Sequence, residues 1–458
     1  MRNVLDLVDQ TFFLGEQATG VTMVLQCVWV YNRAIDIDGL RQFHHHLQRG
    51  RLARRIERSR LPFGRHRWVS PSGQSDLEIA APRPREEFDA WLNEQANTPL
   101  DAEHGPEWHL AVFPFTDGGA GVSLVISHCL TDAVGLCEAL TDAAAGRHDP
   151  ISWPAAGSRR RSQALREDAR QTARDLPGIG GSVFAAARLA RRNRGRAGST
   201  VPLNARPPAP LAGAHERITL PSATIFVDAD EWDARAHSLG GTSNTLLEGL
   251  AARLAQRVGR VTADGSVTLG MPVNLRTAGD TRANAVTNVD ITVDPAPAAT
   301  DLREMRAATK QALIRSQEVP DERLALLPLV PLLPQWLVKR MVSLASSSAT
   351  SVVSSNFGVV NPAACRPDGT DADHFAIKGC NLGVTKAIMH RTGGIMALLS
   401  GRSDRQVFVS VLAYQPDRTN SNDTLRKDLS SALSDFSLTA TIGWPDPANS
   451  SELHGLTA

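Results

Sequence analysis

The chain has 458 residues, more than one hydrophobic core usually holds, and this length predicts two domains. Its 49 Lys and Arg residues balance 48 Asp and Glu residues, which argues against a general nucleic-acid or polyanion binder. The five cysteines are scattered without a CxxC pair, which favours free thiols in a reducing compartment. The opening stretch MRNVLDLVDQ has acids and no uninterrupted apolar core, and no apolar run is long enough to span a membrane. We therefore expect a cytoplasmic protein without a signal peptide.

The first part of the chain mixes strands and helices. Runs rich in β-branched and apolar residues predict strands over 21–31, 66–70, 108–115 and 121–127. The last two are joined by TDGGA, which predicts a hairpin. Helical periodicity predicts helices over 38–50, with Asp38 as the N-cap, over 85–97 and over 131–146. Three consecutive histidines at 44–46 point in different directions on a helix, so we expect no metal site there.

The composition changes from about residue 157. Eleven arginines follow between Arg159 and Arg196, in stretches of helical composition, and the Pro-rich stretch PLNARPPAPLAG comes next. We therefore predict an N-terminal domain over 1–157, a basic helical and Pro-rich linker over 158–215, and a C-terminal domain over 216–458. Two interpretations of the basic segment remain open: a solvated charged face, or a surface that docks on an anionic membrane.

The second part repeats the mixture of elements. Strands are predicted over 216–228, 266–276 and 286–294, and a hairpin over 393–417. Helices are predicted over 229–240, over 242–259 with Thr242 as the cap, and over 301–319. The apolar stretch 324–341 contains three prolines and cannot be one regular helix. We expect it, with Trp336, in a tunnel wall or an interdomain core; a membrane-contacting patch is the alternative.

The stretch SHCLTDAVG, residues 127–135, carries the best candidate for chemistry. The predicted strand ends near His128, and a helix begins near Asp132. A histidine at a strand end titrates near neutrality and can take a proton from an alcohol or amine. Asp132 lies four residues on, where it can cap the helix or pair with an arginine. By itself this spacing is common, and it indicates two structural residues more often than a catalytic pair.

The context of SHCLTDAVG resembles the HHxxxDG signature of the CoA-dependent acyltransferase superfamily. Within it, the chain looks most similar to bacterial wax ester synthase/diacylglycerol acyltransferases. The resemblance runs along nearly the whole chain, through LDLVDQTFFLGE, PLDAEHGPEWHLAVF, TSNTLLEGLAARLA, MPVNLR and VVSSNFGVVNP. It implies a mixed α/β (α+β) fold of two chloramphenicol acetyltransferase-like domains, with a tunnel between them where two substrates meet.

The same resemblance implies roles for individual residues. His128 matches the general base of the motif, and Asp132 matches an aspartate that forms a salt bridge with Arg276. Ser127 stands where the motif has its first histidine. Ala133 stands where it has glycine, and the added methyl would narrow the donor channel. The candidates for substrate or oxyanion contacts are Ser127, Ala133 and Asn244.

The implied reaction is direct transfer from acyl-CoA, as a co-substrate, to the hydroxyl of a hydrophobic alcohol such as a long-chain alcohol or diacylglycerol. It needs no acyl-enzyme, no bound cofactor and no metal. One alternative is a carrier-protein-dependent acyltransferase or condensation enzyme that acts on a polyketide or glycolipid. Another is a catalytically silent lipid-binding homologue, which the missing first histidine favours. A nucleophilic Cys129 is a further alternative, although a small buried cysteine fits the pattern better.

Overall fold

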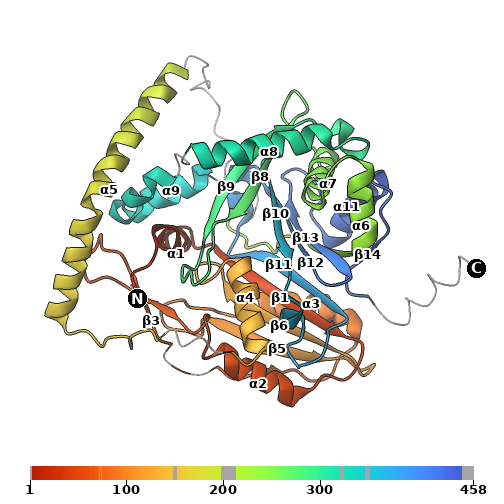
Figure 1. Cartoon of the computed structure of the whole chain (residues 1–458), viewed down its shortest axis with the longest axis horizontal. Coiled ribbons are helices and arrows are strands. Elements are labelled where there is room, and N and C mark those ends of the chain that lie inside the picture. The colour runs from red at the N-terminus through yellow and green to blue at the C-terminus, as the bar shows by residue number, and fades with distance from the viewer. Residues whose placement is uncertain are drawn as a thin grey trace, which may run out of the picture.

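The computed structural model describes residues 3–71, 73, 75–147, 152–196, 213–319, 324–345 and 351–445. These residues form two α/β domains side by side, one built on a five-stranded sheet and the other on a seven-stranded sheet (Figure 1). A separate two-stranded ribbon pairs β2 (Arg55–Glu57) with β3 (Arg67–Val69). The predicted mixed α/β fold with two domains is confirmed.

The sheet of the first domain has the strand order β11-β1-β6-β5-β4. Its strands are β1 (Thr22–Tyr31), β4 (Glu78–Ile79), β5 (Trp108–Pro114), β6 (Ala120–Ser127) and β11 (His374–Leu382). Cys27 and Trp29 of β1 belong to the apolar core that includes α2 (Ile37–Leu47) and α4 (Ala133–Ala144), whereas Val28 and Val30 belong to the core with α3 (Phe88–Ala96). Burial on both faces explains the continuous apolar run of β1.

Strand β11 connects the two halves of the chain. It follows the first strands of the second sheet in sequence, yet it pairs antiparallel with β1, from Thr22 opposite Leu382 to Val30 opposite His374. The continuous ranges 1–157 and 216–458 do not account for this strand. The second half of the chain therefore contributes an edge strand to the sheet of the first domain.

The sheet of the second domain has the order β14-β7-β13-β12-β10-β8-β9. Its strands are β7 (Ser222–Asp228), β8 (Val267–Asn274), β9 (Val286–Val293), β10 (Ser351–Val359), β12 (Ile395–Arg402), β13 (Gln406–Tyr414) and β14 (Ala440–Ile442). The helices of this domain are α6 (Ala229–Ser238), α7 (Ser243–Arg257), α8 (Arg303–Glu318), α10 (Lys386–Thr392) and α11 (Asn422–Asp435). Short 3-10 turns occur along the whole chain: η1 (Arg85–Glu87), which directly precedes α3, η2 (Ala296–Ala299) and η4 (Pro362–Cys365). The predicted hairpin over 393–417 is β12–β13, and its strands pair antiparallel.

Three local predictions need correction or refinement. The N-cap of α2 is Asp36, whose carboxylate accepts from the N–H groups of Asp38 and Gly39, and not Asp38. The proline-broken stretch forms η3 (Leu324–Leu332) followed by α9 (Gln335–Ala345). The side chain of Trp336 is 66% exposed, so it is part neither of a tunnel wall nor of a core.

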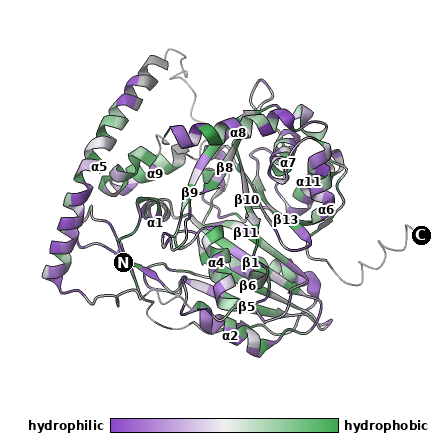
Figure 2. Cartoon of the chain, viewed as in Figure 1, coloured by the Kyte–Doolittle hydropathy of each residue, from purple (hydrophilic) through white to green (hydrophobic). Residues whose placement is uncertain are grey.

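The basic segment forms one long helix, α5 (Arg161–Arg196), which runs along one edge of the molecule (Figure 1). Its surface is mostly hydrophilic, with apolar residues interspersed (Figure 2). Across the described residues, no helix combines the length and the apolar character needed to cross a bilayer. Nearly all of the Pro-rich stretch that follows lies outside the described residues.

Candidate active site

The candidate base follows directly after strand β6, which ends at Ser127. The backbone N–H of His128 donates to the carbonyl of Met23 on β1 at 2.8 Å. Its carbonyl accepts from the side-chain amide of Asn284 at 3.0 Å. The imidazole stacks on Phe12 of α1 (Leu7–Thr19), with ring centroids 5.1 Å apart and planes 7° from parallel. The position of this histidine is therefore fixed from three elements, one of which belongs to the second domain.

The surroundings of His128 favour its neutral form. Burial lowers the pKa of the imidazole, while its own backbone, the charge of Asp132 and the side chain of Asn284 act in the opposite direction. Nδ1 is buried and makes no hydrogen bond within the described structure. A neutral imidazole at neutral pH is the form that can accept a proton from a substrate.

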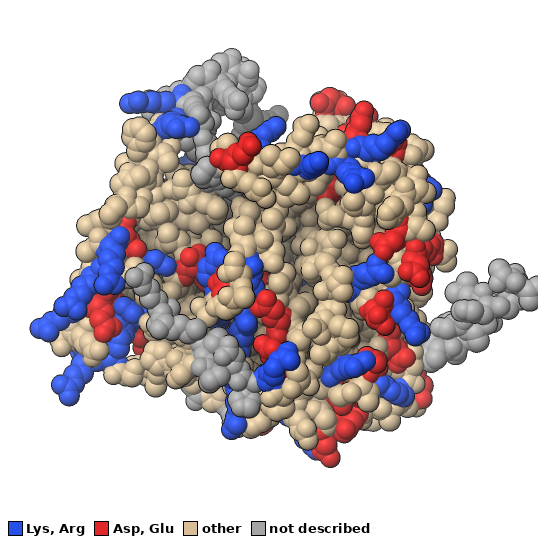
Figure 3. All heavy atoms as spheres, in the orientation of Figure 1, with Lys and Arg blue, Asp and Glu red and all other residues tan. Residues whose placement is uncertain are grey.

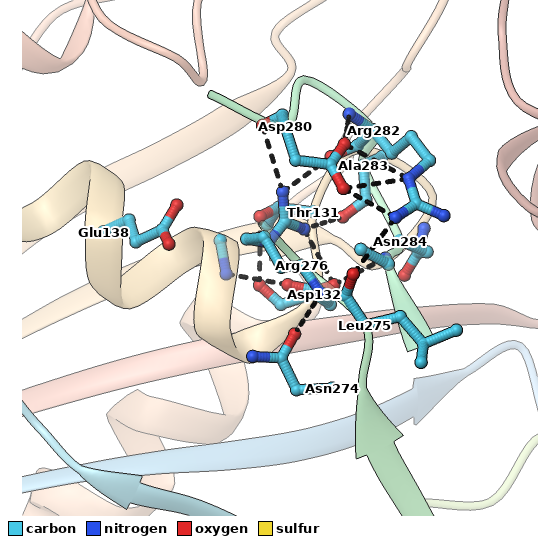
Figure 4. Close-up of polar contacts among 12 residues, drawn as sticks. Thr131, Asp132, Glu138, Asn274, Leu275, Arg276, Asp280, Arg282, Ala283 and Asn284 are labelled. Atoms are coloured by element: carbon cyan, nitrogen blue, oxygen red, sulfur yellow. Dashed lines mark hydrogen bonds and ion pairs between the residues drawn. The ribbon is translucent and has the colours of Figure 1, made fainter. Parts of the chain in front are cut away.

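Asp132 and Arg276 form a buried ion pair that joins the two domains (Figure 4). Arg276 Nη2 lies 2.8 Å from Asp132 Oδ2, and the two side chains are 2% and 4% exposed. The carboxylate also caps α4 by accepting from the N–H of Gly135 at 2.7 Å, and it accepts from the N–H of Ala285 at 2.8 Å. A Cβ atom at Gly135 would come within 2.9 Å of Arg276 Nη2, so glycine is needed for this close approach. The structure thus gives Asp132 a structural position, with both oxygens engaged.

Further polar residues hold the loop between β8 and β9 against the motif. Asp9 on α1 accepts from the N–H groups of Ala283 and Asn284, at 3.0 and 2.7 Å. Burial raises the pKa of Asp9 to about 6, and the positive charge of Arg54 opposes that shift. The guanidinium of Arg54 is itself buried and donates to the carbonyl of Leu130 at 2.8 Å. Sequence reasoning missed these residues, because their partners are distant in sequence and no local pattern marks them.

Ser127 and Ala133 lie beside the base in different surroundings. The hydroxyl of Ser127 donates to Glu16 Oε1 at 3.0 Å and accepts from the N–H of Cys129 at 3.3 Å. Ala133 is the first residue of α4 and packs in the core of the first domain. Ala133 is not among the residues that line the two cavities below, and the narrowing of a donor channel by its methyl group stays a prediction. Burial raises the pKa of the Cys129 thiol well above its usual range, which disfavours a nucleophilic thiolate.

Asn244 is not brought to the base. It lies on α7 in the second domain, where its amide nitrogen donates to Glu248 Oε1 at 2.5 Å. Glu248 Oε2 accepts from the hydroxyl of Thr309 on α8 at 2.7 Å. Thr245, its neighbour, forms a capping box with Thr242 at the start of α7. The suggested oxyanion contact by Asn244 is therefore not supported, because its side chain is committed to a helix–helix contact.

Two cavities are lined by residues near the motif, and His128 itself is among the lining residues of neither. The first, the α1 cavity, has a volume of about 470 Å³ and is lined by residues of α1, α9, α10, β10 and β12, among them Phe12, Glu16, Met23, Val353, Ile388 and Met396. The second, the α4 cavity, has a volume of about 400 Å³ and is lined by Arg51, Val134, Cys137, Glu138, Gly279 and Phe357, among others. Phe12 connects the first to His128 through ring stacking, and Val134 borders the second just after Asp132. The two cavities share no lining residue, and a tunnel that passes His128 stays a prediction.

The overall architecture is shared with several solved structures. The first condensation domain of the calcium-dependent antibiotic synthetase, in complex with a substrate analogue, matches with a TM-score of 0.57 and 13% identity, over 95% of this chain and 96% of that chain. The wax ester synthase/diacylglycerol acyltransferase from Marinobacter aquaeolei VT8 matches with a TM-score of 0.52 and 14% identity, over 94% and 98%. Polyketide synthase associated protein 5 from Mycobacterium tuberculosis matches with a TM-score of 0.51 and 14% identity, over 94% and 97%.

At these identities the likeness concerns the fold. No protein-family model matches the chain, and no curated protein matches it by sequence. The chain therefore has the two-domain fold that condensation domains share with the wax ester synthase, on a divergent sequence.

Proposed function

We propose that the chain is an acyltransferase that moves an acyl group from an acyl-CoA thioester to the hydroxyl of a lipid-like acceptor, such as a long-chain alcohol or diacylglycerol. The observation that carries the proposal is the buried imidazole of His128, whose surroundings favour its neutral form and whose ring stacks on Phe12 in the wall of the α1 cavity. The fold shared with condensation domains and a wax ester synthase supports it.

The proposed reaction has one transfer step. The neutral imidazole of His128 takes the proton of the acceptor hydroxyl as its oxygen attacks the thioester carbonyl. The tetrahedral intermediate then collapses, the carbon–sulfur bond breaks, and the proton passes to the leaving thiolate. A positioned base of this kind contributes roughly 100- to 10,000-fold to the rate. Asp132 and Arg276 hold the loop that carries the base and take no proton.

The walls of the α1 cavity support a lipid-like substrate. Most of its lining is apolar, including Met23, Val353, Ile388 and Met396. Cavities of this size with mainly apolar walls bind hydrophobic ligands, and polar side chains in the wall, here including Arg260, Lys339 and Arg391, fix the orientation of the ligand. The α4 cavity is more polar, and its rim carries the ion pair between Arg51 and Glu138 at 2.9 Å.

Ester formation from defined substrates tests the proposal. The chain is incubated with acyl-CoA thioesters of increasing chain length and with 1-hexadecanol or diolein, and esters are identified by mass spectrometry. We expect an ester to form with some of these thioesters. If the same acyl groups react only as carrier-protein thioesters, the chain is a carrier-dependent enzyme. If no thioester reacts but a lipid still binds, the chain is a silent lipid-binding homologue.

A further inference from the structure

Glu16 lines the α1 cavity at the end nearest the base. It lies four residues after Phe12 on α1, so the two side chains share one face of the helix. Both line the cavity; Phe12 stacks on His128, and Glu16 accepts a hydrogen bond from Ser127, the residue before His128. A carboxyl group therefore belongs to the wall of a mainly apolar cavity, beside the candidate base.

This carboxyl group has no cationic partner. Among the described residues, no lysine, arginine or histidine forms an ion pair with Glu16. Burial raises its pKa to about 7, opposed by hydrogen bonds from Ser127, Cys129 and the backbone of Met23. Asp132, by contrast, is neutralised by an arginine and two backbone N–H groups. Glu16 thus keeps hydrogen-bonding capacity that the protein itself uses only in part.

The proposed reaction leaves this capacity for the substrate. An acceptor hydroxyl has a single proton, and that proton must go to His128. A ligand that fills the cavity without offering Glu16 another donor would bury the carboxyl group with part of its hydrogen-bonding capacity unused, which is costly. A ligand with a second donor on the neighbouring atom would satisfy the base and the carboxyl group together.

We propose that the α1 cavity binds the acceptor, and that Glu16 selects an acceptor with a second hydrogen-bond donor next to the nucleophilic hydroxyl, such as a 1,2-diol or a 1,2-amino alcohol. The proposal rests on the proposed function, because it assigns the nucleophile to His128. Ser127 is a positioning residue that fixes one oxygen of the carboxyl group. Sites that are built to hydrogen-bond a substrate group reject analogues that lack it.

Equilibrium binding tests this selection without requiring turnover. The affinities of 1,2-octanediol and 1-octanol are measured by isothermal titration calorimetry for the wild type, Glu16→Leu and Glu248→Leu. Glu248 is the matched control, because burial also raises its pKa to about 7 while it lies between helices of the second domain, outside the α1 cavity. One additional hydrogen bond to a charged group should make the diol bind at least about tenfold more tightly than 1-octanol.

We expect the wild type and Glu248→Leu to prefer the diol at least about tenfold, and Glu16→Leu to lose that preference. Glu16→Gln keeps an acceptor for Ser127 and should fold where Glu16→Leu does not; it should retain part of the preference. A wild type that binds 1-octanol as tightly as the diol overturns the proposal, as does a preference that survives in Glu16→Leu. Preference for the diol without ester formation counts against the proposed function alone, and ester formation without the preference counts against this proposal alone.

Discussion

The buried pair of Asp132 and Arg276 is the contact on which the position of the candidate base depends most. It links the loop after β6 to the loop before β9, across 144 residues of chain. Because both partners are almost fully buried, loss of one leaves the other as an unpaired buried charge. The sequence predicts this pair only through the family resemblance, since nothing local connects the two residues.

We expect Asp132→Ala to lower the free energy of unfolding by about 3 to 5 kcal/mol. Asp301→Ala is the control, because Asp301 pairs with Arg303 on the surface, where the two side chains are 36% and 77% exposed. An exposed pair contributes little to stability, because solvent screens both charges. Urea unfolding of both variants checks the prediction, and equal losses would contradict it.

Glu248 provides a prediction about pH at the residue scale. Burial raises its pKa to about 7, so the folded state binds a proton that the unfolded state releases between its usual pKa and pH 7. The free energy of unfolding therefore falls as pH rises through this window. Glu248→Gln should remove this loss. Its free energy of unfolding, relative to that of the wild type, should therefore rise by on the order of 3 kcal/mol from pH 5 to pH 8. Urea unfolding of both proteins at the two pH values measures this change. If the difference in free energy of unfolding between the variant and the wild type is the same at pH 5 and pH 8, the pKa shift is contradicted.

At the scale of elements, patterns in sequence predict strands and helices better than they predict partners. The apolar runs of β1, β5 and β6 predict the residue ranges of these strands correctly. The pattern does not reveal β11, where Lys378 and Gly379 interrupt the apolar run, nor its pairing with β1. The pattern also does not reveal the role of α1 in the site. Phe12 and Glu16 belong to the site through contacts with residues more than 100 positions away in the sequence.

Helix α5 has an outer face suited to an anionic surface, and we propose that this face docks on anionic lipid. Its acids turn inward: Asp168 pairs with Arg67 and Arg159, and Asp175 pairs with Arg65. The exposed face carries basic and apolar side chains, including Arg166, Arg170, Arg174, Leu165, Leu176, Val183 and Phe184. Lysine and arginine side chains project from this edge of the molecule in Figure 3. Apolar residues beside basic residues on one exposed face are typical of interfacial helices.

Sedimentation with vesicles of phosphatidylglycerol or phosphatidylcholine checks this proposal. We expect binding to the anionic vesicles, and we expect reversal of Arg166, Arg170 and Arg174 to Glu to weaken it at least about a hundredfold, since each basic residue contributes about 1 kcal/mol. The same reversal of Arg306, Lys310 and Arg315 on α8 is the matched control. Equal and negligible binding to both kinds of vesicle would leave α5 as a solvated charged face.

At the scale of the whole molecule, the two domains are joined where the candidate site lies. The ion pair of Asp132 with Arg276 and the bonds of Asp9 to the β8–β9 loop cross between the domains. The ladder of β1 with β11 places a strand from the second half of the chain in the sheet of the first domain. The base therefore lies at a junction that the folded second domain completes. Composition and length predict two domains, but the shared strand and the position of the junction depend on tertiary contacts that a single sequence does not specify.

The central claim is that His128 is the base of an acyl transfer. The most direct measurement is the rate of free thiol release from palmitoyl-CoA, with the best acceptor from the ester-formation experiment, for the wild type and His128→Ala. The control is His237→Ala, on α6 in the second domain, where the ring contacts the backbone carbonyl of Asp233. We predict that His128→Ala lowers turnover at least about a hundredfold while His237→Ala leaves it unchanged. A folded His128→Ala variant with wild-type turnover would contradict the claim.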